Sequence, residues 1–378
     1  MPSLTRQDLR MNYQLVGADL RPGQAPVAMI HGLGANLAFW YLGAVRHLAP
    51  DLPILLHDLR GHGASSMPPS GYLLHDLAAD FAALLDHLQI ERAHVVGHSH
   101  GARVALAFAI AHPERVASLT VADTQLRALQ RPMRLADWPY WPRWKAELAG
   151  QGVTSFPPED AEIDFRLLAD LGPRGGAALA GARAAISAVN DEAGPEDPPE
   201  LSLLPGAGGG RLAAALARPG AGALAARMPR LAALAAERAA ERAAPEAPRR
   251  IDLRSRQMGA RGSQKWQTLL ETTSAGVELA DESDVPADRL PGLKMPVLLI
   301  YGALSHCVPS SDKLLEVIPD ARRILVPNAG HFFPIVKPRL FARALRMFVA
   351  GVETAGTPAR GRFRERIQAA RAARMRPQ

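Results

Sequence analysis

Residues 93–101 read Ala-His-Val-Val-Gly-His-Ser-His-Gly, and this stretch decides the fold. The apolar run 93–96 is typical of a buried strand, and the small residues of 102–111 favour a helix. Gly97 and Gly101 allow a sharp turn between the two, where a Cβ atom would clash. Such a turn holds the hydroxyl of Ser99 exposed at the strand tip, as a nucleophile requires. A glycine-rich turn with an ordinary serine is the alternative, so the rest of the chain decides between them.

Composition places the chain among globular proteins. Its 378 residues are enough for a sizeable core in one large domain or two, and 48% of them are hydrophobic. The single cysteine, Cys307, rules out an intrachain disulfide. Residues 1–26 have no apolar run of signal-peptide length, and no stretch reaches the roughly 20 apolar residues of a membrane span. We therefore expect a cytoplasmic protein without a membrane span.

Positive charge gathers at the C-terminal end. The formal net charge is +7, and residues 359–378 hold seven arginines against one acid, Glu365. A basic arm of this kind is suited to nucleic acid or an anionic membrane. Only one aromatic residue, Phe363, accompanies the arginines, so stacking on bases is not indicated. We expect a solvated basic tail over 353–378 and no nucleic-acid partner.

Short apolar runs alternate with helical patterns over 12–125, and the alternation returns over 291–350. An apolar rhythm of 3.6 residues predicts a helix over 73–88, and a closing helix is predicted over 340–349. Alternating strands and helices are typical of a parallel sheet covered by helices on both faces. The predicted strands are 12–16, 27–30, 54–57, 93–96, 118–122, 297–301 and 323–326.

The region 131–290 lacks this alternation and resembles an insertion between two halves of one sheet. It opens with an aromatic cluster made of Trp138, Tyr140, Trp141 and Trp144. Residues 191–262 are rich in Pro, Gly and Ala, and we expect part of them to be a flexible linker. The high helix propensity of alanine predicts a helix over 231–244. An insertion of this kind is typical of a cap or lid.

Three further motifs follow predicted strands. His31-Gly32 ends the strand at 27–30, and a glycine there lets a backbone N–H approach an oxyanion closely. Asp58-Leu59-Arg60-Gly61-His62-Gly63-Ala64-Ser65 follows the strand at 54–57, and Gly330-His331 follows the strand at 323–326. Each motif falls where a serine nucleophile at the strand tip requires it.

With these motifs in this order, the chain resembles the α/β-hydrolase superfamily over about 12–130 and 291–350. The resemblance implies an α/β fold in which a mostly parallel eight-stranded sheet is flanked by helices. It also implies a mainly helical cap inserted after the sixth strand. The resulting domains are 1–130 and 291–352 for the two parts of the core, 131–290 for the cap and 353–378 for the tail. The motifs are specific for fold and nucleophile and poorly specific for substrate.

The resemblance assigns roles to individual residues. Ser99 is the nucleophile, and it needs a base within hydrogen-bond reach because a serine hydroxyl is a weak nucleophile. The family places the base on the loop after the last strand, which selects His331 from the twelve histidines. The backbone N–H groups of Leu33 and His100 are expected to form the oxyanion hole.

The acid departs from the family's commonest pattern. Most relatives carry an aspartate after the seventh strand in a Gly-x-x-Asp-x-x-Val-Pro frame, and here the frame runs over 302–309 with Ser305 at the aspartate position. Asp123 ends the predicted sixth strand, where some relatives place the acid, and we favour it. In the alternative, Asp123 is structural and the enzyme is slow or has lost hydrolysis. Asp312 is a weaker candidate, because it is expected to open a helix.

Other polar and aromatic residues have two interpretations. His98, Trp138 and Trp141 are candidates for the substrate pocket, since ligand sites are rich in aromatic side chains; the tryptophans are equally suited to anchoring the cap. The resemblance gives Asp58 and Arg60 a structural role, as an ion pair and tight turn beside the oxyanion loop. The cysteine and histidines lack metal-ligand spacing, so no metal is predicted, and no cofactor is indicated.

Taken together, the sequence predicts a serine hydrolase that cleaves a carboxylic ester or thioester in a small-molecule acyl substrate through an acyl-enzyme on Ser99. An acyltransferase or a C–C bond hydrolase could use the same three residues. A non-hydrolytic binding protein on the hydrolase scaffold is a further alternative, which the serine at 305 keeps open. No feature of the sequence indicates an oligomeric state.

Overall fold

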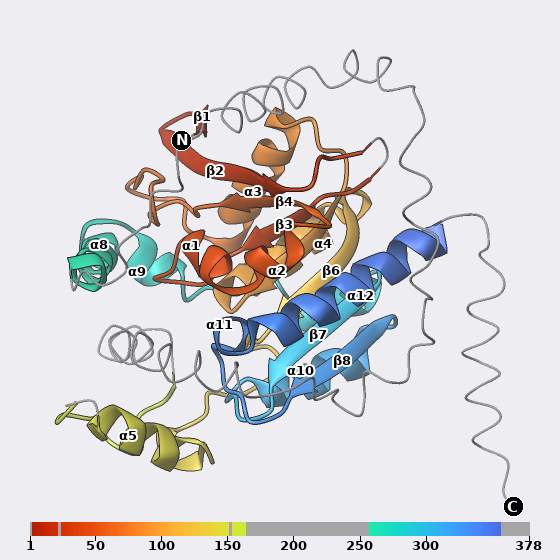
Figure 1. Cartoon of the computed structure of the whole chain (residues 1–378). Helices are drawn as coiled ribbons and strands as arrows, with labels where there is room; N and C mark the ends of the chain where they lie inside the picture. The colour runs from red at the N-terminus through yellow and green to blue at the C-terminus, as the bar shows by residue number, and fades with distance from the viewer. Residues whose placement is uncertain (1, 22–23, 151–152, 164–256, 357–378) are drawn as a thin grey trace, which may run out of the picture.

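A computed structural model of the chain describes residues 2–21, 24–150, 153–163 and 257–356 (Figure 1). Its centre is an eight-stranded sheet in the order β1-β2-β4-β3-β5-β6-β7-β8. The β1–β2 and β2–β4 pairs are antiparallel and the remaining pairs are parallel. The strands are β1 (Ser3–Arg6), β2 (Leu9–Gly17), β3 (Val27–Ile30), β4 (Pro53–His57), β5 (Ala93–His98), β6 (Val116–Ala122), β7 (Val297–Gly302) and β8 (Ala321–Val326).

Helices cover both faces of the sheet, as the alternating sequence pattern predicts. In Figure 1, α1, α2 and α12 lie in front of the sheet, and α3 and α4 lie behind it. The helices of the core are α1 (Ala38–Trp40), η1 (Tyr41–Val45), α2 (Arg46–Leu48), α3 (Leu74–His87), α4 (His100–Ala111), η2 (Pro113–Arg115), α10 (Val308–Val317), α11 (Phe333–Val336) and α12 (Pro338–Gly356).

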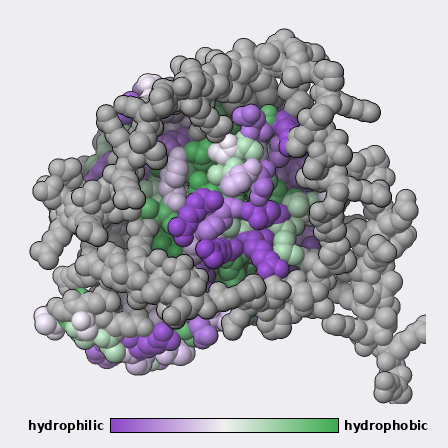
Figure 2. All heavy atoms as spheres, in the orientation of Figure 1, coloured by the Kyte–Doolittle hydropathy of each residue, from purple (hydrophilic) through white to green (hydrophobic). Residues whose placement is uncertain are grey.

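Each face of the sheet has its own hydrophobic core. Val95 and Leu119 point to the side of α3 and α4, where they pack with Phe81 and Phe108. The alternate strand residues point to the other side, where α1, α2, α11 and α12 pack on them. The helix α12 is amphipathic, with Phe341 and neighbouring apolar side chains buried against the sheet. In the space-filling view, hydrophilic residues gather where α12 crosses the front of the molecule (Figure 2).

The register of the parallel strands brings the candidate site together. His98 at the end of β5 pairs with Ala122 of β6, which in turn pairs with Ile300 of β7. The carboxyl ends of these strands therefore lie along one edge, where ligands bind in open α/β sheets. Ser99 and Asp123 are the next residues after β5 and β6.

The described parts of the insertion contain several short helices, and residues 153–163 between them are not helical. The helices are η3 (Leu135–Asp137), α5 (Trp141–Gly150), α8 (Gln257–Thr272), α9 (Ala275–Glu278) and η6 (Ala287–Gly292). The returning helices dock on the loop after β4: Lys265 Nζ donates to the carbonyl of Gly63, and a Glu278 carboxylate oxygen accepts from the Tyr72 amide. Trp266 and Leu269 bury apolar surface beside Leu33 at this contact.

The predicted fold class is confirmed, with differences at its margins. All seven predicted strands are present, and β1 is an additional edge strand that the sequence pattern did not reveal. The closing helix is longer than 340–349, because α12 runs from Pro338 to Gly356 and takes in the start of the predicted tail. The predicted helix at 231–244, most of the predicted linker and residues 357–378 lie outside the described residues. No helix in the described ranges has the length and apolar character of a membrane span.

Candidate active site

Ser99 sits at a strained turn between β5 and α4. Its backbone is left-handed, with φ 54° and ψ −123°, a conformation that non-glycine residues rarely adopt. The Ser99 amide donates to the carbonyl of Ala122, at 3.0 Å, which fixes the turn against the end of β6. Strain of this kind persists only where the surroundings over-determine it, and it is frequent at functional sites.

The flanking glycines are required by close backbone packing. A Cβ atom on Gly97 would lie 2.2 Å from the carbonyl oxygen of Gly101, and one on Gly101 would lie 2.4 Å from that of Ile30. Both distances are far below van der Waals contact. Gly32 approaches from the neighbouring loop, since a Cβ there would lie 3.1 Å from Cβ of Ser99. The predicted turn is therefore present, and the His31-Gly32 loop lies directly beside the serine.

The two predicted oxyanion donors flank Ser99. His100 is the first residue of α4, so its N–H has no acceptor within the helix. Leu33 follows Gly32 on a loop that the side chain of His31 holds in place. Nδ1 of His31 lies 2.8 Å from the Gly32 carbonyl, and Nε2 of His31 accepts from the Leu59 amide at 3.1 Å. Burial lowers the pKa of His31 to about 4, so the ring is neutral and Nδ1 carries the donated proton.

Asp123 and His331 are in direct contact. Oδ1 of Asp123 lies 2.9 Å from Nδ1 of His331, although the two residues are 208 positions apart in the chain. The Asp123 side chain is completely buried, and that of His331 is 9% exposed. The structure thus places the predicted acid against the predicted base, with Nδ1 of the imidazole oriented by a carboxylate.

The Asp123 carboxylate has further donors. The amide of Gly302 donates to Oδ2 at 2.7 Å, and the Ser305 hydroxyl donates to Oδ1 at 2.5 Å. Burial alone would raise the pKa of Asp123, but the hydrogen bonds from His331, Ser305 and Gly302 outweigh it and hold the pKa below its usual value. The carboxylate is therefore charged at neutral pH in a site that excludes water.

Ser305 stands at the position where the family pattern has its acid, and its hydroxyl contacts the carboxylate of Asp123, the acid predicted from the sequence. The other candidate, Asp312, lies in α10 and forms a half-exposed ion pair with Arg323. The geometry therefore favours Asp123 over Asp312 as the partner of His331.

His98 lies behind the site, in contact with the base. Its ring stacks on Phe39 with centroids 4.6 Å apart, and its Nε2 lies 2.9 Å from the backbone carbonyl of His331. Burial lowers the pKa of His98 to about 3, so it is neutral and donates from Nε2 to that carbonyl. These contacts hold the His331 loop, a role that differs from the predicted lining of the substrate pocket.

The aromatic cluster anchors the insertion. Trp138 Nε1 donates to the carbonyl of Leu304 at 3.0 Å, which ties the cluster to the loop after β7. Trp141 is 1% exposed and donates to Glu159 within the insertion itself. Of the two interpretations made from the sequence, the anchoring one matches these contacts. A pocket role for Trp138 and Trp141 remains a prediction that no contact among the described residues supports.

Asp58 and Arg60 are structural, as expected, but they do not pair with each other. Asp58 accepts from the amides of Leu37 and Ala64, at 2.8 Å each, and so ties the β4 loop to the segment before α1. Arg60 makes a two-pronged ion pair with Asp80 of α3, at 2.6 and 2.7 Å.

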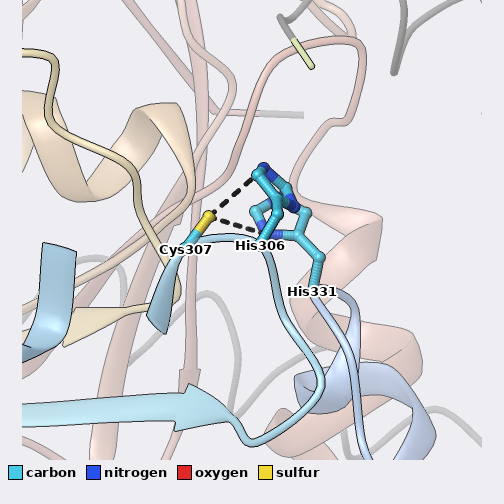
Figure 3. Close-up of side chains that lie close together, drawn as sticks. All are labelled: His306, Cys307 and His331. Atoms are coloured by element: carbon cyan, nitrogen blue, oxygen red, sulfur yellow. Dashed lines mark hydrogen bonds between the residues drawn. The ribbon is translucent and has the colours of Figure 1, made fainter. Parts of the chain in front are cut away.

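Two neighbours of His331 have no role in the sequence prediction. Cys307 Sγ lies 3.8 Å from Nδ1 of His331 and 3.4 Å from Nε2 of His306 (Figure 3). Both residues follow Ser305 directly, so the loop after β7 supplies three consecutive side chains around the acid–base pair. The only signal in the sequence that could have identified His306 and Cys307 is that they directly follow Ser305, which stands where the family pattern has an aspartate.

Comparisons with known proteins agree with this architecture. A family model described as alpha/beta hydrolase fold matches residues 25–153. The chain is 38% identical over 122 residues to 3-oxoadipate enol-lactonase 2 of Acinetobacter baylyi, a match that covers 32% of this chain and 44% of that protein. It is 33% identical over 127 residues to the poly(3-hydroxyalkanoate) depolymerase of Ectopseudomonas oleovorans, covering 33% and 44%. The matches span less than half the length of these curated relatives.

Solved structures share the fold over most of the chain. The lactone-degrading enzyme Est816 superposes with a TM-score of 0.51 at 20% identity, covering 92% of this chain and all of the other. The haloalkane dehalogenase DbeA of Bradyrhizobium elkani gives a TM-score of 0.51 at 18% identity, covering 94% and 99%. At such identities the likeness concerns the fold alone, and the two names denote different chemistries.

Proposed function

The chain belongs to the α/β-hydrolase superfamily, and on that premise we propose that it is a serine hydrolase that cleaves a carboxylic ester or thioester through an acyl-enzyme on Ser99. The observation that carries the proposal is the contact of the buried Asp123 carboxylate with Nδ1 of His331, at 2.9 Å, beside the strained turn of Ser99. A nucleophile, a base and a group that orients the base form the minimum set for acyl transfer to serine.

In the proposed reaction, Ser99 Oγ attacks the carbonyl carbon while Nε2 of His331 takes the hydroxyl proton. The amides of Leu33 and His100 bind the oxyanion. His331 then gives its proton to the leaving alcohol or thiol as the C–O or C–S bond breaks. Water, activated by the same imidazole, releases the acyl group and restores Ser99.

The electrostatics around the base suit this sequence of steps. Asp123 is charged and stabilises the imidazolium that forms when His331 takes a proton. Burial lowers the pKa of two neighbouring histidines, His98 and His306, to about 3 each. These rings are neutral at pH 7, so they do not oppose the positive charge that develops on His331.

The names of the relatives suggest a substrate panel. An enol-lactonase and a poly(3-hydroxyalkanoate) depolymerase are among the curated proteins that match about a third of the chain. Lactones and 3-hydroxyalkanoate esters therefore belong in the panel beside simple aryl esters and acyl thioesters.

A fluorophosphonate probe followed by product analysis tests the proposal. We expect the wild-type protein to be labelled on Ser99 and to turn over at least one ester, lactone or thioester, and S99A to do neither. Folded wild-type protein that resists the probe would instead favour a binding protein on this scaffold. Products that carry the acyl group on an acceptor other than water would favour an acyltransferase.

A further inference from the structure

The loop after β7 brings a metal-binding constellation against the catalytic base. One possible ligand atom from each of His306, Cys307 and His331 lies within 4.8 Å of the others, and all three residues are largely enclosed (Figure 3). We propose that this His306–Cys307–His331 cluster is an inhibitory site for a divalent zinc ion, which competes with Asp123 for Nδ1 of His331.

The separations between the atoms fit one tetrahedral ion. Zinc binds thiolate at about 2.3 Å and imidazole at about 2.0–2.1 Å, so neighbouring ligand atoms around it lie roughly 3.3–3.7 Å apart. Cys307 Sγ lies 3.4 Å from Nε2 of His306 and 3.8 Å from Nδ1 of His331. These two separations match the tetrahedral values, and the two imidazole nitrogens lie within 4.8 Å of each other, so the ion draws them closer together on binding. Two imidazoles and one thiolate are a donor set that zinc prefers.

The neighbourhood keeps the first two ligands in place. Trp138 packs edge-on against the His306 ring, with centroids 5.5 Å apart, and the His306 carbonyl accepts from the side chain of Gln130. Cys307 is 1% exposed, and its amide donates to the Ser305 hydroxyl. An ion can approach from the side of His331, the most exposed of the three, and three protein ligands leave the fourth position of the tetrahedron open.

Zinc binding and the acid–base contact exclude each other, because both use Nδ1 of His331. When the ion binds, the Cys307 thiol releases its proton to solvent as the Zn–S bond forms. The proton on Nδ1 of His331 leaves that nitrogen, and the neutral ring carries its proton on Nε2 instead. The nitrogen that has to accept the Ser99 proton is then already protonated. The ion thus removes the orienting carboxylate contact and the basic nitrogen together, with no change of oxidation state.

The inhibitory effect rests on the proposed function, whereas ion binding does not. The experiment therefore measures both on untagged, chelator-treated, full-length protein. Titration calorimetry with zinc chloride gives affinity and stoichiometry, and downfield proton NMR follows the proton shared by His331 and Asp123. We expect one ion per chain, loss of the downfield resonance on binding, and loss of ester hydrolysis that a chelator reverses.

Two variants and one control locate the site. C307S and H306Q leave the proposed catalytic residues intact, and each is expected to weaken zinc binding by about 10–100-fold or more, since even the loss of an outer-shell partner costs that much. Both are expected to keep hydrolysing ester at inhibiting zinc concentrations. H75Q is the matched control: it removes an exposed imidazole beside Asp284, where surface zinc could collect, and is expected to change nothing.

Unchanged zinc affinity in both C307S and H306Q would overturn the site. Zinc bound at the cluster with the downfield resonance intact would overturn the competition for Nδ1. If no ester or thioester is hydrolysed at all, the proposed function fails, while calorimetry and NMR still decide whether the cluster binds zinc.

Discussion

The hydroxyl of Ser305 donates a hydrogen bond of 2.5 Å to Oδ1 of Asp123, the same oxygen that contacts Nδ1 of His331. Ser305, at the position where the family pattern has its acid, thus contacts the proposed acid, Asp123, which follows the neighbouring strand. In the proposed mechanism Ser305 is a positioning residue, because it would act on His331 only through Asp123.

Replacing Ser305 with alanine removes one donor from the Asp123 carboxylate. The pKa of Asp123 is held low partly by that donor, so it rises in S305A, and less of the carboxylate is charged on the acid side of the profile. We expect the acid limb of the kcat/KM profile to move to higher pH, and kcat/KM at pH 7 to fall by about tenfold, since a hydrogen bond to a charged group contributes about 1.5–3 kcal/mol. S305T, which keeps the hydroxyl, is the control, and an unshifted acid limb in S305A would contradict the positioning role.

Replacing Asp123 with asparagine tests the acid itself. In D123N the side chain of residue 123 is neutral and no longer stabilises imidazolium, and a comparable change in a serine protease lowers kcat by about 10⁴. We expect a loss of that size, together with slower fluorophosphonate labelling of Ser99. Undiminished turnover in D123N, with S99A inactive, would show that Asp123 is structural.

A double variant moves the carboxylate back to the family's usual position. Because Ser305 Oγ already lies 2.5 Å from Oδ1 of Asp123, an aspartate at 305 is close enough to reach the His331 imidazole. We expect D123N/S305D to recover about tenfold or more of the activity lost in D123N. The single variant S305D is the comparison: its two carboxylates cannot both ionise at that distance, so it is expected to be less active than the wild type at pH 7. Equal activities of D123N and the double variant would mean that residue 305 cannot replace Asp123.

The buried histidines predict a loss of stability on mild acidification. Burial lowers the pKa of His57 to about 4, and neither ring nitrogen has a hydrogen-bond partner among the described residues. Between pH 6.5 and 4 the unfolded chain binds a proton that the folded chain refuses, so the free energy of unfolding falls by about 1.4 kcal/mol per pH unit for this residue.

The variant H57F isolates that contribution, because phenylalanine fills similar space beside Phe81 and carries no titratable group. We expect the free energy of unfolding of H57F minus that of the wild type to be about 2 kcal/mol larger at pH 5 than at pH 7.5, because the variant lacks the loss that His57 causes. Urea unfolding at the two pH values measures the difference. Parallel pH dependence in the two proteins would mean that His57 titrates normally in the fold.

Alanine substitutions at Gly97, in the turn at Ser99, and at Gly351, in α12, are expected to change stability in opposite directions. In G97A the new Cβ would meet the Gly101 carbonyl oxygen at 2.2 Å, a backbone overlap that no rotamer relieves. We expect a destabilisation of more than about 3 kcal/mol and loss of Ser99 labelling. A Cβ atom on Gly351 of α12 would meet no atom within 4 Å, so G351A is expected to stabilise by about 0.5–1 kcal/mol. Thermal unfolding compares them, and a tolerated G97A would contradict the required close approach.

The sequence predicted the central fold because its strands are continuous apolar runs. Val27–Ile30 is buried at every position and was located without error. The edge strand Ser3–Arg6 was missed, since it is short and partly exposed and carries no such run. Gly97 and Gly101 were recognised because the sharp turn between strand and helix needs glycines at both positions, and that requirement is local in sequence.

The support of the acid–base pair could not be predicted in the same way. That Asp123 faces His331 depends on β6 lying next to β7, which a resemblance suggests and local pattern does not. The bonds from Ser305 and the approach of Cys307 depend on the path of a single loop after β7. Trp141 was a candidate for the substrate pocket because aromatic content alone does not distinguish a side chain that lines a pocket from one that anchors the insertion. In the structure its side chain is buried and bonds Glu159 within the insertion itself.

The long separation of Asp123 and His331 also governs when the site comes into being. A ribosome adds about 5–20 residues per second, so the 208 positions between them take roughly 10–40 s to synthesise. Until Val297–Gly302 has been made, β6 has no β7 to pair with, and its outer edge is a template for other strands. A nascent chain therefore carries Ser99 long before it has a base, and the protein becomes competent only when nearly the whole core has emerged.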